Sequence, residues 1–185
     1  MVATESESTL QRGDDAPSFS LRGTDGETYS LDTFEDSAAL LLVFTCNHCP
    51  YAQAKFDLLN ELAVEYDDAA IVGINPNDAE AYPEDSYETM QEYVESDRVD
   101  YDAYLRDESQ AVADAYGAVC TPDPFLLRNE GDRWTIAYHG RLDDALNPED
   151  EPSEFYIRDA IDAVIAGEEV DVPDRPSRGC SIKWK

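Results

Sequence analysis

Two cysteines separated by two residues form the first chemically capable group in the chain, Cys46-Asn47-His48-Cys49. A dithiol exchanges disulfides when one thiolate attacks a substrate disulfide and the second thiol resolves the mixed disulfide. Two intervening residues keep the sulfurs close enough to bridge. Because the chain contains only 4 cysteines, this spacing indicates redox or metal chemistry rather than a disulfide scaffold.

The attacking thiolate must exist near neutral pH, and the surroundings of the pair offer two ways to stabilise it. The motif lies between an apolar run and a helical pattern, so Cys46 is expected to face a helix N-terminus, whose dipole favours a negative sulfur. His48, as an imidazolium, would add to this effect. We therefore predict a lowered pKa for Cys46, with Cys46 attacking and Cys49 resolving. The redox-active group would be a Cys46–Cys49 disulfide, with no bound cofactor.

The elements that position the motif follow from the hydrophobic pattern. Residues 40–44 are an unbroken apolar run, which predicts a central strand covered on both faces, and residues 52–66 carry apolar side chains at helical spacing. The other predicted elements are extended segments 16–21 and 28–31, strand 70–74, helix 85–95, strand 101–105, a short helix between 107 and 117, a hairpin of 125–127 with 134–139, and a last helix from Ser153 to Gly167. This order predicts an α/β fold with a mixed sheet between helices. Residues 1–12 are expected to be a flexible acidic tail, and 13–185 a single domain.

The charge of the chain excludes whole classes of partner. Asp and Glu number 42 against 13 Lys and Arg, a formal net charge of −29. Such a surface repels nucleic acid and anionic membranes. The composition resembles that of halophilic cytoplasmic proteins, with an acidic mesophilic protein as the alternative. No apolar run reaches the roughly 18 residues of a membrane span, and the start of the chain is acidic where a signal peptide is basic and then apolar. We therefore expect a cytoplasmic location.

Several further segments carry a family resemblance. They are Ala16-Pro17-Ser18-Phe19-Ser20-Leu21, the Asp25-Gly26 turn, Cys46 to Tyr51, Cys120-Thr121-Pro122-Asp123, Gly140-Arg141-Leu142-Asp143-Asp144 and Gly179 to Trp184. Over about residues 14–185 the chain resembles the thioredoxin-like superfamily, in its peroxiredoxin-like (redoxin, AhpC/TSA-related) subgroup with a thioredoxin-type CxxC motif. The resemblance implies a thioredoxin fold with a mixed central sheet flanked by helices, an N-terminal hairpin and a C-terminal extension.

The resemblance also implies roles for individual residues. Pro122 matches the cis-proline that lies against the dithiol in thioredoxins. Thr121 and Pro122, with Thr45, Asn47 and Pro50, would then form the substrate groove. The implied partners are protein or small-molecule disulfides and an unidentified recycling reductant. The chain would act as a monomer or a homodimer.

Departures from the family patterns decide between activities. Peroxiredoxins carry Pro-x-x-x-Thr-x-x-Cys and an Arg that helps hold the peroxide. With Cys49 in the peroxidatic place, Leu42 and Cys46 stand where Pro and Thr belong, and Thr121-Pro122-Asp123 occupies the Arg region. Disulfide exchange is therefore favoured. A thiol-dependent peroxidase with an antioxidant role, using Cys49 or Cys46, is the alternative, and a non-catalytic redox sensor is a further one.

Three secondary interpretations complete the set. Cys120 would either approach the dithiol or be an inert buried residue, and Cys180 would be either an additional resolving thiol or part of a docked tail. A zinc site of Cys46, His48 and Cys49 with Cys120 or Cys180 lacks the usual second ligand pair, so no metal is expected. His139 is expected at the surface.

Overall fold

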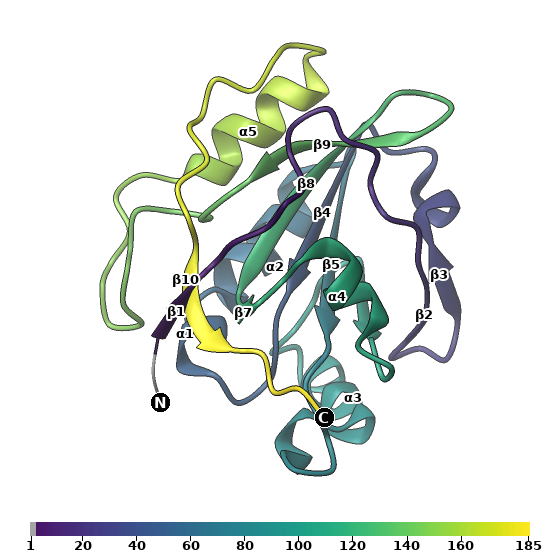
Figure 1. Ribbon diagram of the computed structural model, residues 1–185, viewed down its shortest axis with the longest axis vertical. Helices are drawn as coiled ribbons and strands as arrows, with labels where there is room; N and C mark the ends of the chain where they lie inside the picture. Colours follow the sequence, from purple (N-terminus) through teal and green to yellow (C-terminus); the bar gives the residue numbers. More distant parts are fainter. Residues whose placement is uncertain (1–2) are drawn as a thin grey trace.

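The computed structural model describes residues 3–185 of the chain. A seven-stranded mixed sheet in the order β3-β2-β6-β5-β4-β8-β9 forms its centre, with helices on both faces (Figure 1). Its strands are β2 (Ser20–Gly23), β3 (Thr28–Ser30), β4 (Ala39–Phe44), β5 (Ala69–Asn75), β6 (Ala103–Arg106), β8 (Asp123–Asn129) and β9 (Trp134–His139). The helices are α1 (Pro50–Gln53), α2 (Phe56–Glu65), α3 (Tyr87–Glu95), α4 (Ala111–Tyr116) and α5 (Tyr156–Ile165), with short 3-10 helices at Leu31–Phe34 and Pro83–Asp85. The predicted α/β fold with a mixed sheet is confirmed.

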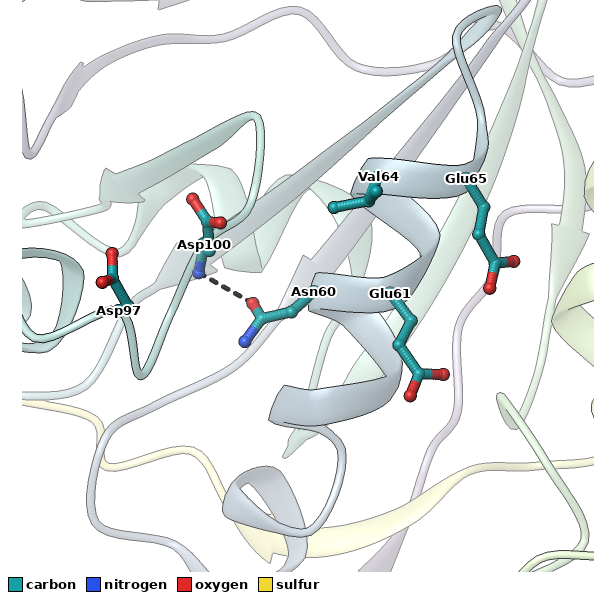
Figure 2. Close-up of a pocket in the computed structure, with 6 residues that line it drawn as sticks. All are labelled: Asn60, Glu61, Val64, Glu65, Asp97 and Asp100. Carbon is teal, nitrogen blue, oxygen red and sulfur yellow. Dashed lines mark hydrogen bonds between the residues drawn. The ribbon is translucent and has the colours of Figure 1, made fainter.

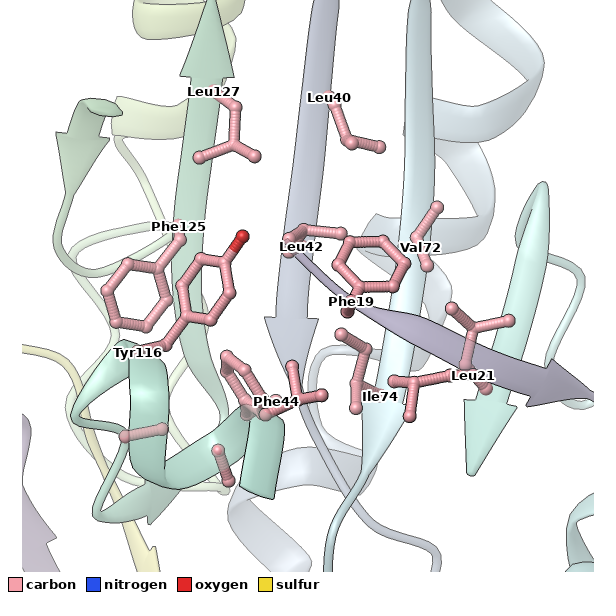
Figure 3. Packing of buried hydrophobic residues seen from close by; sticks show 14 of the residues in the cluster. Phe19, Leu21, Leu40, Leu42, Phe44, Val72, Ile74, Tyr116, Phe125 and Leu127 are labelled. Atoms are coloured by element: carbon pink, nitrogen blue, oxygen red, sulfur yellow. The ribbon is translucent and has the colours of Figure 1, made fainter. Parts of the chain in front are cut away.

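Strand β4 is the central strand that the apolar run predicts. All six of its residues are buried; it runs parallel to β5 and antiparallel to β8. Because side chains alternate along a strand, Leu40, Leu42 and Phe44 enter the core under α4 (Figure 3). Leu41 and Val43 enter the opposite core, which α2 and α5 cover. Both cores hold β4 rigidly, so the loop that follows it starts from a fixed point.

A second, smaller sheet joins the two ends of the chain to the middle. Its order is β1 (Ala3–Glu5), β10 (Arg178–Ser181) and β7 (Cys120–Thr121), all antiparallel, and Figure 1 shows β10 beside β1. Residues 3–5 therefore form a paired strand within the segment expected to be a flexible tail. The pairing satisfies backbone groups on the free edge of β10, a long-range effect that local sequence does not reveal. Met1 and Val2 lie outside the described residues.

The predicted helix 52–66 is divided into two. Helix α1 ends at Gln53 and α2 begins at Phe56. Lys55 lies at the break, and its Nζ is 2.6 and 2.7 Å from the two carboxylate oxygens of Asp143. The apolar spacing continues through the break, so periodicity alone does not reveal it. Among residues 3–185, no helix is both long and apolar enough to cross a membrane.

Candidate functional site

The loop between β4 and α1 carries the cysteine motif. Cys46 follows the last residue of β4 by two positions, and Cys49 directly precedes Pro50, the first residue of α1. Both thiol-bearing side chains are fully buried, and Cys180 of β10 joins them in the same cluster with 1% of its surface exposed. Three of the four cysteines therefore meet at one place.

The sulfurs are not paired as the sequence led us to expect. Cys49 forms a disulfide with Cys180, and Cys46 is free. The reason lies in the topology of the small sheet. Strand β10 places Cys180 opposite Thr121, and the carbonyl oxygen of Thr121 lies 3.6 Å from Cys49 Sγ. The Cys46–Cys49 disulfide is thus not the pairing in this structure, whereas Cys180 lies in the site.

Thr121 contacts both motif cysteines, and Pro122 follows it in the chain. Their peptide bond is cis, and the Thr121 hydroxyl is 3.4 Å from Cys46 Sγ. Cys120, one residue earlier, is opposite Ser181 in the strand register, and its sulfur lies 3.9 Å from the Ser177 hydroxyl, outside the three-sulfur cluster. Cys120 is therefore a buried cysteine that lies apart from the other three.

The free thiol has an environment opposite to the one we predicted. Burial, and then the Asp85 carboxylate, raise the pKa of Cys46 to about 12, against smaller lowering contributions that include the Thr121 hydroxyl and the Lys183 ammonium. The predicted lowering of the pKa of Cys46 is wrong for this conformation. Helix α1 has only four residues, and desolvation of the sulfur outweighs the helix effect.

Asp85 is a site residue that the sequence analysis did not identify. It lies in the 3-10 helix Pro83–Asp85 and is fully buried. Its Oδ1 accepts hydrogen bonds from the backbone N–H of Asn47 (2.7 Å) and from Asn75 Nδ2 (3.3 Å). Its Oδ2 accepts from Asn77 Nδ2 (2.9 Å) and pairs with His48 Nδ1 (2.5 Å). One carboxylate thus holds both residues between the two motif cysteines.

His48 is fixed on two sides. Besides its contact with Asp85, its ring stacks on Tyr82 with 5.5 Å between centroids. Nδ1 faces the carboxylate, and Nε2 is buried without a hydrogen-bond partner among the described residues. The imidazole is therefore oriented, with one ring nitrogen left free.

Four of the five expected groove residues, Thr45, Asn47, Thr121 and Pro122, are buried. Asn47 is fully buried; its side chain accepts from the Tyr104 hydroxyl (2.7 Å) and donates to the carbonyl of Glu84 (2.9 Å). Thr45 is also fully buried. In this conformation both hold the loop in place rather than line an open groove, whereas Pro50 is exposed at the start of α1.

The zinc site considered from the sequence does not fit this arrangement. Ligand atoms of Cys46, His48 and Asp85 lie within 4.8 Å of one another. However, a carboxylate offers about four acceptor positions, and the four donors above use those of Asp85. The Cys49 sulfur is engaged in the disulfide, so the group lacks the four free ligands of a structural zinc site.

A second buried pair corrects the expectation for His139. Its Nε2 lies 2.6 Å from Asp123 Oδ1, and its ring stacks on Phe125 at 4.0 Å between centroids. Burial raises the pKa of Asp123, while the hydrogen bond from His139 lowers it. His139 ends β9 next to β8, so strand pairing brings it to Asp123 of the neighbouring strand and covers it.

A groove on the molecular surface lies away from the cysteines. A groove of about 350 Å³ runs along α2, lined by Val64, Asn60 and four acidic residues, Glu61, Glu65, Asp97 and Asp100 (Figure 2). Asp100 donates its backbone N–H to Asn60 Oδ1 across it (2.7 Å). No cysteine or histidine lines this groove, and clustered carboxylates are ordinary on a chain of this charge. It has no part in the chemistry of the cysteines.

Comparison with known proteins identifies the family of the chain. The AhpC/TSA family model matches residues 12–138. The chain belongs to the AhpC/TSA family. No protein with a curated description matches this family member.

Two solved structures resemble this AhpC/TSA protein over nearly its whole length. A conserved protein from Geobacillus kaustophilus is 39% identical, with a TM-score of 0.91, and the match covers 100% of this chain and 97% of that one. A hypothetical protein from Sinorhizobium meliloti is 39% identical, with a TM-score of 0.90 and 98% of each chain covered. The thioredoxin domain of a thiol-disulfide oxidoreductase from Bacteroides vulgatus is 20% identical, with a TM-score of 0.56, covering 71% of this chain and 91% of that domain. The predicted thioredoxin-like fold is thereby confirmed, and family membership together with the clustered cysteines supports a thiol redox function.

Proposed function

We propose that the protein is a thiol–disulfide oxidoreductase in which Cys49 attacks the substrate disulfide and Cys46 resolves the mixed disulfide. One observation carries this assignment: Cys49 is disulfide-bonded to Cys180 on an incoming strand, while the free thiol of Cys46 lies in the same buried cluster. The Cys49–Cys180 bond resembles a mixed disulfide, and the Cys46 thiol beside it resembles a resolving thiol.

The assignment reverses the roles expected from the motif alone. Cys46 was expected to attack because of a lowered pKa, but its pKa is raised to about 12 by burial and by Asp85. A thiol that stays protonated in the closed form is a poor initial nucleophile, because the thiolate is the reactive species. It can still act as a resolving group when a neighbouring base accepts its proton.

Each step conserves one disulfide bond. The Cys49 thiolate attacks a substrate disulfide, the substrate S–S bond breaks, and one substrate thiolate leaves. The Cys46 sulfur then attacks Cys49, which releases the second substrate thiolate and forms Cys46–Cys49. Attack of the Cys180 thiolate on Cys49 restores the closed form and frees Cys46. A dithiol reductant returns the chain to its starting state by the reverse exchange.

Strand β10 controls access to this chemistry. The side chains of Cys46 and Cys49 have no exposed surface, and Cys180 has 1%. An external disulfide therefore reaches Cys49 only when β10 moves away from β7. Protein or small-molecule disulfides are the substrates that this chemistry implies.

Trapping variants test the assignment of roles. A Cys46→Ser/Cys180→Ser protein retains the attacking thiol without a resolving thiol, so it should accumulate mixed disulfides on Cys49 when mixed with oxidised glutathione or an oxidised protein. A Cys49→Ser/Cys180→Ser protein, which retains Cys46, should accumulate few mixed disulfides. Mass spectrometry of the adducts identifies the cysteine. Adducts mainly on Cys46 would restore the opposite order of attack, and none on either cysteine would refute disulfide exchange.

A thiol-dependent peroxidase is the second candidate, because the chain belongs to the AhpC/TSA family and its disulfide joins the start of α1 to the C-terminal strand. In a peroxidase cycle, peroxide would oxidise the Cys49 thiolate to a sulfenic acid, and the Cys180 thiol would condense with the sulfenic acid to give the disulfide and water. Hydrogen peroxide oxidation of the reduced protein in molar salt separates the candidates. A rate near that of an ordinary free thiol excludes the peroxidase, whereas a rate orders of magnitude higher that vanishes with Cys49→Ser establishes it.

A further inference from the structure

The burial of the Asp85 carboxylate requires a physical explanation. The side chain is fully buried, and removing a charge from water is costly unless partners replace the hydration. Four donors supply that replacement: the Asn47 backbone, Asn75, Asn77 and His48. Three of these donors are amide N–H groups, which have no acid–base chemistry near neutral pH. The fourth, His48, has chemistry of its own.

The geometry around His48 brings together a thiol, an imidazole and a buried carboxylate. The Cys46 sulfur, a ring nitrogen of His48 and a carboxylate oxygen of Asp85 all lie within 4.8 Å of one another. A carboxylate bound to one ring nitrogen selects the tautomer in which the other nitrogen accepts a proton. With Nδ1 on Asp85, that nitrogen is Nε2, which is buried and has no partner among the described residues.

We propose that Asp85 is a positioning residue that holds His48 as the proton acceptor for Cys46 in the resolving step. This inference rests on the proposed disulfide exchange and deepens it. When Cys46 attacks the Cys49 mixed disulfide, its S–H proton passes to His48 Nε2. The sulfur electron pair forms the Cys46–Cys49 bond, and the bond from Cys49 to the substrate sulfur breaks. The departing substrate thiolate takes a proton from solvent, and His48 later returns its own proton to solvent.

Other charged and titratable groups face this unit from neighbouring elements. Lys183 of the C-terminal segment lies with Nζ 5.8 Å from the centroid of the Tyr82 ring, the ring on which His48 stacks. Lys183 also lowers the pKa of Cys46, in opposition to Asp85. The direct effect of the Asp85 charge is therefore to keep Cys46 protonated, which would slow the resolving step. A positioning role predicts the opposite consequence of removing that charge, and this difference makes the two roles separable.

The test follows the two steps separately in a Cys120→Ser/Cys180→Ser protein treated with a neutral dipyridyl disulfide. Stopped-flow absorbance reports release of the first thiopyridone on attack by Cys49 and of the second on resolution by Cys46. We expect Asp85→Asn to leave the first phase within about twofold and to slow the second by tenfold or more, since positioned acid–base groups contribute about 10²- to 10⁴-fold. We also expect Asp85→Asn to change the pH dependence of the second phase relative to the parent protein.

A double-mutant comparison supplies the control for a merely structural role. If Asp85 acts through His48, Asp85→Asn should slow the second phase no further in a His48→Gln background. A second phase that is unchanged or faster in Asp85→Asn would overturn the proposal, as would additive effects of the two substitutions. If Asp85→Asn does not fold, His48→Gln alone decides, because an unaltered second phase in that variant also refutes the proton transfer. Absence of the first phase in the parent protein would instead refute the proposed function itself.

Discussion

Gly179 on β10 gives the sharpest test of whether that strand covers the cysteines. A Cβ added at this position would lie 1.9 Å from the carbonyl oxygen of Thr121, where ordinary contact begins at 3.4 Å. The backbone of Gly179 is not in the left-handed region, so Gly179→Ala acts through this overlap alone. The strand must therefore move by about 1.5 Å, the difference of the two distances.

The magnitude follows from the cost of overpacking, about 1–3 kcal/mol. If that cost falls on the docking of β10, the equilibrium constant for its opening rises about 5- to 150-fold. Alkylation of Cys46 should accelerate by the same factor, because the reagent reaches this buried thiol only in the open form. Iodoacetamide labelling of the reduced protein, in which no disulfide ties β10 to Cys49, followed by peptide mass spectrometry, measures the rate separately for Cys46 and Cys120.

Arg178→Ala, at an exposed position on the same strand, is the matched control and should leave both rates unchanged. The thermal unfolding midpoint of each variant shows whether the whole domain has been weakened. Cys46 labelling as slow in Gly179→Ala as in the parent protein, despite a lowered midpoint, would refute the view that β10 is the barrier to access.

Three further results are expected. Lys55→Met leaves the Asp143 carboxylate, which is 1% exposed, without its cation, and it should lower the free energy of unfolding in urea by about 3 kcal/mol. The double variant Lys55→Met/Asp143→Asn should recover most of this loss. A loss below about 1 kcal/mol in Lys55→Met would mean that the ion pair is solvated. Because the pKa of Cys46 is raised to about 12, its alkylation rate should climb about tenfold per pH unit beyond pH 9, where the rate of an ordinary thiol levels off. The same pKa shift means that the contribution of this thiol to stability declines as the pH rises above its unfolded pKa. An alkylation rate that reaches a plateau near pH 9 would contradict both statements. The net charge of −29 predicts that the thermal midpoint rises between about 0.1 and 1 M KCl as the Debye length falls from about 10 to 3 Å, as the expected halophilic character requires; equal midpoints would exclude it.

The central strand and the motif loop can be predicted from the sequence, because their signals are local. An unbroken apolar run such as Leu40 to Phe44 has few alternatives to a buried strand, and it ends beside the cysteines. The family resemblance, and not a local signal, placed Thr121 and Pro122 against the motif. Strand β10 was not foreseen, because Arg178-Gly179-Cys180-Ser181 has neither alternation nor β-branched residues. Its place comes from pairing with β1 and β7 and from the bond of Cys180 to Cys49.

The identity of the buried acid was beyond sequence reasoning for a different reason. Asp85 is one of 42 acidic residues, and its partners His48 and Asn77 belong to separate segments. What singles it out is complete burial among four donors, a property of the folded chain. The error over the pKa of Cys46 has the same origin, since desolvation and the Asp85 charge arise only after folding.

The side chain of Asn77 links two events that otherwise look independent. Its Nδ2 donates to Asp85, while its Oδ1 accepts the backbone N–H of Lys183 in the C-terminal segment (2.9 Å). The amide is 1% exposed, so departure of either partner leaves a buried polar group unsatisfied, at a cost of about 1–3 kcal/mol. Docking of the C-terminal segment and anchoring of the carboxylate that holds His48 are therefore thermodynamically coupled. By linkage the coupling is reciprocal: whatever loosens the chain terminus loosens the imidazole, and whatever fixes the imidazole favours the docked terminus.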